Sequence, residues 1–216
     1  MIAALAMALA LAGTPVPDAR IVPAERVFAF WSQYNALPEE ERNAFTLRYG
    51  LGGTGPGGED WRFWTALEGE DWVEITPGPE GVVTPPDPDR LAAGLRLATD
   101  APQGAVRAEV QFALSAAPAR VYALEELQAA LAQSRAALRR QLGLRALIAP
   151  RPRRIDFTFE GPAPDAFAVF ADGRELELTS VFENVIQLDP GARELRGAQT
   201  IRFARAPLHA VIVVAN

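Results

Sequence analysis

Cysteine and lysine are absent from the 216-residue chain, and histidine occurs only once. Without cysteine the chain can form no disulfide, thiolate metal site, thiol nucleophile or lipid-modified cysteine. The single histidine, His209, leaves too few nitrogen ligands for the usual zinc sites and has no serine elbow to serve. We therefore expect stability to come from packing, and we expect no metal, no cofactor and no catalytic residue.

Positive charge is in the minority as well. The chain carries 21 basic and 27 acidic residues, a net charge of −6, and its pI is about 5.0. An acidic chain repels the phosphate backbone, so we expect no nucleic-acid partner. An apolar fraction of 49% with 22% charged residues is typical of a folded chain with a sizeable core.

The chain has no hydrophobic run long enough for a membrane-spanning helix, which needs roughly 20 residues. Its longest run, IAALAMALALA at residues 2–12, ends in an A-x-A pattern just before Gly13. That pattern predicts a signal peptide over residues 1–12, although no basic residue precedes the run. We expect a periplasmic location, or secretion as the alternative, and no transmembrane segment after cleavage.

A self-comparison predicts an internal duplication. Residues 74–94 align without a gap on residues 177–197, a shift of 177 − 74 = 103. Identical residues occur at Glu74, Thr76, Glu80, Val82, Arg90 and Gly94. Upstream, residues 42–46 match residues 154–158 at a shift of 112, and downstream the shift becomes 105. The expected organisation is a first repeat unit at residues 13–118 and a second at residues 119–216.

Each repeat is expected to open with a helix and to continue as short antiparallel strands, which predicts an α+β fold. Apolar residues at helical spacing predict helices over residues 23–35 and 124–142, with Gly143 ending the second. Strict alternation predicts a half-buried strand over residues 106–114. Each unit would therefore hold one N-terminal helix and a small antiparallel sheet or sandwich.

Aromatic and acidic residues gather in one short stretch of the first repeat. Trp61, Trp64 and Trp72 lie close in sequence to Glu68 and Glu70. Aromatic faces beside carboxylates are typical of glycan-binding or glycan-cleaving grooves. The same aromatic residues are equally typical of a protein core, because a period of two puts Trp61 and Trp64 on opposite faces of a strand.

The second half of each repeat resembles small bacterial envelope proteins of a domain-of-unknown-function class. The residues that carry the resemblance are Val82-Val83, Pro86-Asp87, Arg90 and Gly94, then Val185-Ile186, Asp189-Pro190, Arg193 and Gly197. The resemblance implies an envelope location and no particular activity.

These observations favour a non-enzymatic periplasmic protein that binds or scaffolds another envelope protein. One alternative is a glycan- or peptidoglycan-binding module that uses Trp61, Trp64 and Trp72. Another is a carboxylate-dependent hydrolase that uses Glu68 or Glu70. The oligomeric state stays open.

Overall fold

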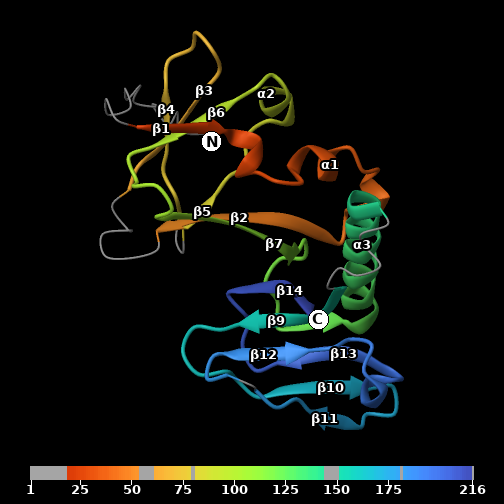
Figure 1. The fold of residues 1–216 in the computed structure, drawn as a ribbon. Coiled ribbons are helices and arrows are strands. Elements are labelled where there is room, and N and C mark those ends of the chain that lie inside the picture. Colours follow the sequence, from red (N-terminus) through yellow and green to blue (C-terminus); the bar gives the residue numbers. More distant parts are fainter. Residues whose placement is uncertain (1–18, 54–60, 79–80, 144–150, 181, 216) are drawn as a thin grey trace, which may run out of the picture. The chain divides into compact units, whose positions relative to one another are not determined.

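The computed structural model describes residues 19–53, 61–78, 81–143, 151–180 and 182–215 (Figure 1). Every strand pair within those ranges is antiparallel and helices accompany the sheets, which confirms the predicted α+β class. The predicted signal peptide lies outside the described residues.

Contacts divide the chain into two compact units. The first comprises Met1–Ser32 with Arg48–Val110, and the second comprises Gln33–Leu47 with Gln111–Asn216. Two strands, β2 (Phe45–Gly53) and β7 (Val106–Leu114), contribute residues to each unit. The second of these strands has the bounds expected for residues 106–114. The expected strict alternation is wrong, because Ala108 is exposed and the neighbours Phe112 and Ala113 are both buried.

The first unit contains a four-stranded sheet with the order β1-β6-β3-β4. Its further elements are β5, which pairs with β2, and two short helical segments. The bounds are β1 (Arg20–Pro23), η1 (Ala24–Arg26), β3 (Phe63–Ala66), β4 (Val73–Ile75), β5 (Val82–Val83), α2 (Pro88–Ala92) and β6 (Arg96–Thr99).

Both faces of this sheet are covered at its centre. Phe63 and Trp64 are neighbours in β3, yet they are only 3% and 1% exposed. Because successive strand side chains point to opposite faces, a pair of adjacent buried aromatic residues requires packing on both sides. The first unit therefore buries a core on each side of β3.

The helix expected over residues 23–35 is wrong as a single element. Its first residue belongs to β1, η1 follows, and regular α-helix occurs only in α1 (Trp31–Asn35). Phe30 has φ 68°, a left-handed value at which a right-handed helix cannot continue. The apolar residues that suggested helical spacing instead pack on β2, where the rings of Phe28 and Trp31 meet Tyr49 edge-on at 5.3 and 6.1 Å.

The second unit has the same kinds of elements around one long helix. A four-stranded sheet has the order β11-β10-β13-β8, and a second set of hydrogen-bonded strands runs in the order β12-β9-β14-β7. The bounds are η2 (Glu39–Glu41), β8 (Val121–Ala123), α3 (Leu124–Leu142), β9 (Arg151–Thr158), β10 (Ala166–Phe170), β11 (Glu175–Glu177), β12 (Val185–Leu188), η5 (Arg193–Leu195), β13 (Ala198–Phe203) and β14 (His209–Ala215).

Helix α3 confirms the bounds expected from its apolar stripe. Leu124, Leu127 and Leu131 are buried at 4%, 1% and 3% exposure, and Gly143 follows with φ 51°. The side chain of Gln133 accepts from the Ala44 N–H at 2.9 Å and donates to the Glu40 carbonyl at 2.9 Å. These bonds, with Arg140 against Glu41 at 2.8 Å, explain why residues 33–47 belong to the second unit.

Candidate functional site

The structure separates the three tryptophans expected to form a binding surface. The β3–β4 register pairs Phe63 with Ile75 and Thr65 with Val73. Continued by one residue, this register places Trp72 opposite Ala66. Trp61 precedes the other end of the hairpin, five residues away, which corresponds to roughly 15 Å along a strand. Trp64 lies between them in the core at 1% exposure. The described geometry therefore forms no single groove from Trp61, Trp64 and Trp72.

An arginine side chain lies against the buried indole of Trp64. The Arg62 guanidinium lies 5.2 Å from the Trp64 ring centroid and also pairs with Asp100 at 3.3 Å. The Nε1 atom of Trp64 has no hydrogen-bond acceptor among the described residues. Trp72 is half-buried, and the Arg96 guanidinium lies 5.5 Å from its ring. Arginine therefore already occupies a face of two of the three candidate indoles.

Glu68 and Glu70 lie in the turn between β3 and β4. Both are exposed, and the Glu70 carboxylate accepts from Arg90 at 2.5 Å. The same carboxylate oxygen accepts from the Leu67 N–H at 3.5 Å, and the Glu70 N–H donates to the Leu67 carbonyl at 3.2 Å. These bonds give Glu70 a clear part in holding the turn and leave Glu68 as a solvated side chain.

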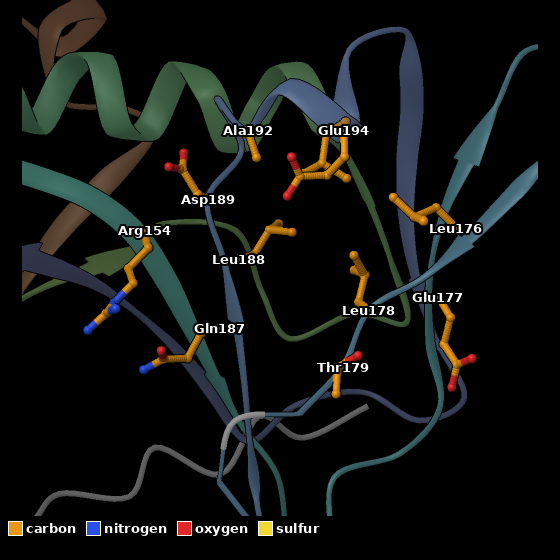
Figure 2. A pocket seen from close by; sticks show the side chains of 11 residues that line it. Arg154, Leu176, Glu177, Leu178, Thr179, Gln187, Leu188, Asp189, Ala192 and Glu194 are labelled. Carbon is orange, nitrogen blue, oxygen red and sulfur yellow. The ribbon is translucent and has the colours of Figure 1, made fainter.

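A pocket in the second unit was not expected from the sequence. Its volume is about 520 Å³, within the range of roughly 300–1,000 Å³ that is usual for ligand pockets. It opens between β11, β12 and η5 (Figure 2), and it is lined by Arg154, Leu176, Glu177, Leu178, Thr179, Gln187, Leu188, Asp189, Ala192, Glu194 and Leu195.

Leucine side chains form the inner wall of this pocket. Leu176 of β11, Leu178 just after β11 and Leu188 of β12 point into one space (Figure 2). Leu188 and Leu195 are each 2% exposed, whereas Leu176 and Leu178 are half-buried. The pocket therefore offers a preformed apolar wall that is still partly open to solvent.

Carboxylates stand around the rim of the pocket. Glu177 and Glu194 are exposed, and neither makes an ion pair with another residue that the structure describes. Asp189 differs, because its carboxylate accepts from Arg153 at 3.4 Å and from the Gly191 N–H at 2.9 Å. Unpaired carboxylates therefore flank the apolar wall, although the Glu177 side chain points away from the pocket (Figure 2).

A second polar group lies on the opposite side of β9 and β12. Figure 2 shows Arg154 and Gln187 pointing away from the pocket leucines. Gln187 donates to Asp156 at 3.0 Å, and the Arg154 Nε atom lies 3.9 Å from the other carboxylate oxygen. Burial raises the pKa of the Asp156 carboxyl, an effect that exceeds the opposite influence of Gln187 and Arg154. This group ties the two strands together, and the side chains of Arg154 and Gln187 point away from the pocket that these two residues help to line (Figure 2).

The remaining features concern metals, membranes and the single histidine. Among the described residues no cluster of histidine and acidic side chains could hold a metal ion. None of the helices in those ranges has the length and apolar character needed to cross a membrane. His209 begins β14.

Comparison with known proteins adds no relative. No family model, curated protein or solved structure matches the chain. The pocket and the strands around it therefore provide the main basis for a functional proposal.

Proposed function

We propose that this chain is an exported envelope protein that binds another component non-covalently, through the pocket between β11, β12 and η5. The observation that carries the proposal is the leucine wall beside unpaired carboxylates, in a space of about 520 Å³. A concave apolar site with a few polar groups at its rim is the usual form of a binding site. The periplasmic location rests on the signal-peptide pattern of residues 1–12 and on the resemblance to envelope proteins.

We also propose that the chain arose by tandem duplication, as the matched residues 74–94 and 177–197 suggest. The two four-stranded sheets have the orders β1-β6-β3-β4 and β8-β13-β10-β11. In both, the first strand along the chain is at one edge, the fourth lies next to it, and the second and third follow. The β3–β4 register, moved by 103 residues in each strand, continues the β10–β11 register, which pairs Phe167 with Glu177. A shared strand order with a shared register supports common descent of the two repeats.

Two glycines give further support. Gly94 follows α2 with φ 87°, and Gly197 follows η5 with φ 88°. Each glycine precedes the strand that joins the middle of its sheet, β6 or β13. Equivalent backbone geometry at aligned positions is expected if both repeats derive from one module.

The strand register changes one part of the sequence alignment. Tyr49 pairs with Val83, and Phe157 pairs with Ile186. If Val83 corresponds to Ile186 at a shift of 103, then Tyr49 corresponds to Phe157 at a shift of 108. Both rings are buried, at 1% and 0% exposure. The repeats therefore align better here at 108 than at the shift of 112 that sequence matching suggested.

The two repeats differ at the place where the second has its pocket. In the first unit Arg90, on α2, neutralises Glu70 at 2.5 Å. In the second unit the aligned arginine is Arg193, and Glu194 on η5 stands at the position of Leu91, with no ion pair among the described residues. Divergence of this kind is expected when one copy keeps a structural role and the other acquires a binding role.

Binding of the neutral apolar dye Nile red tests the pocket assignment. We expect its fluorescence to rise on adding the full chain, and Leu178→Asn to abolish most of that rise. Ile75→Asn is the matched control, because Ile75 is a half-buried residue at the corresponding place in β4. Circular dichroism would verify that both variants fold. An undiminished rise with folded Leu178→Asn would rule out the pocket as the binding site.

A further inference from the structure

The outer edge of β11 has backbone hydrogen-bonding groups that no described residue pairs with. β11 is the end strand of its sheet and pairs only with β10 in the described residues. The Leu178 N–H donates to the Ala166 carbonyl, and the Phe170 N–H donates to the Arg174 carbonyl, each at 2.9 Å. In an antiparallel pair the bonded residues alternate, so Glu175 and Glu177 direct their N–H and C=O groups outward.

Side chains along this edge alternate between two environments. Leu176 and Leu178 are half-buried and point toward the pocket, whereas Glu177 points away from it (Figure 2). Glu175 and Glu177 are both exposed. A strand placed beside β11 would repeat this alternation, with one face toward the leucines and the other beside the carboxylates.

We propose that the pocket receives an extended polypeptide segment of a partner, added as a strand to the free edge of β11, in which apolar and basic side chains alternate. Backbone pairing with Glu175 and Glu177 would fix its register, in the manner of other complexes formed by strand addition. Its apolar side chains, roughly 6.6 Å apart at alternate positions, would enter the leucine-lined space. This inference rests on the proposed function, since it assigns the same pocket a specific class of partner.

Charge selects the basic residues of that partner. The Glu175 carboxylate already binds Arg202 at 2.6 Å, but Glu177 and Glu194 make no ion pair with another described residue. A basic side chain directly across from Glu177 would form a favourable cross-strand pair, and an acidic one would be repelled. An arginine or lysine at that position is therefore expected, flanked by apolar residues.

The test uses synthetic nonapeptides and the full chain. The first peptide alternates arginine with leucine, the second alternates glutamate with leucine, and the third repeats the first with alternate backbone nitrogens methylated. Calorimetric titration at low salt should show the arginine peptide binding at least about 10-fold more tightly than the glutamate peptide. The methylated peptide should bind at least about 10-fold more weakly than its parent, because it cannot complete strand pairing.

Two charge variants locate the interaction. Glu177→Gln should weaken binding of the arginine peptide about 3- to 10-fold. Glu74→Gln, the aligned change in β4 of the first unit, should leave it unchanged. Equal binding of the arginine and glutamate peptides, full binding of the methylated peptide, or no effect of Glu177→Gln would each overturn the inference. Nile red binding that persists in that case would leave the proposed function standing, and its absence would remove both.

Discussion

The glycines that follow α2 and η5 allow a quantitative test of the equivalence of the two repeats. An added Cβ at Gly94 or Gly197 would meet nothing within 4 Å, so Gly→Ala introduces no clash. The cost would come from the backbone alone, since φ is 87° and 88°. Holding an L-residue in this region costs roughly 1–2 kcal/mol. We expect Gly94→Ala and Gly197→Ala each to lower the free energy of unfolding by about 1–2 kcal/mol.

Two further glycines provide the comparison. Gly81 also has a positive φ, 72°, but its added Cβ would lie 2.5 Å from the Leu51 carbonyl oxygen, so Gly81→Ala should cost more than either repeat glycine. Gly52 has no positive φ and open space around it, so Gly52→Ala should change stability by less than about 0.5 kcal/mol.

Urea denaturation followed by circular dichroism would measure these differences. Destabilisation should increase from Gly52→Ala to Gly94→Ala and Gly197→Ala, which should be equal, and should be greatest for Gly81→Ala. Alanine tolerated at Gly94 but strongly destabilising at Gly197 would refute the equivalence of the two backbones. Asparagine, which tolerates left-handed backbone, should be less costly than alanine at both positions.

Three other predictions concern stability, pH and export. Tyr49→Phe removes a hydroxyl that donates to the Ala29 carbonyl at 2.6 Å, and should cost about 1–2 kcal/mol in urea denaturation. Burial raises the pKa of the Asp156 carboxyl above its usual 3.8, so the native state binds the proton more tightly than the unfolded state. The stability of the wild type should therefore fall as pH rises above 3.8. Asp156→Asn should gain stability relative to the wild type over that pH range. Equal pH profiles of the two proteins would contradict this. N-terminal sequencing of protein from a periplasmic fraction should begin at Gly13, and a sequence beginning at Met1 would argue against the signal peptide.

Local sequence pattern was enough to predict the elements whose stability is local. The 19 residues of α3 were correctly bounded because an apolar stripe, acidic residues in the first turn and Gly143 all agree. The bounds of β7 were predicted equally well, although its burial does not alternate strictly. In residues 23–35 the same helical spacing was misleading, because pairing of β1 with β6 and the left-handed Phe30 take precedence over the local preference.

The pocket could not be predicted in the same way. Its leucines come from β11 and the residue that follows it, from β12 and from η5, and strand order and register bring them together, which no local pattern encodes. The conspicuous aromatic residues instead belong in part to the core, as the burial of Trp64 shows. One sequence signal did mark the region: the aligned segment 177–197 contains several of the residues that line the pocket.

Amide hydrogen exchange at β11 would show whether a partner strand adds to its outer edge. The outward N–H groups of Glu175 and Glu177 should exchange quickly in the free protein, since no described residue accepts from them across the free edge. Adding the alternating arginine–leucine peptide should slow exchange at both amides and leave those of β4 in the first unit unchanged. Unaltered exchange at Glu175 and Glu177 with the peptide bound would contradict strand addition at this edge.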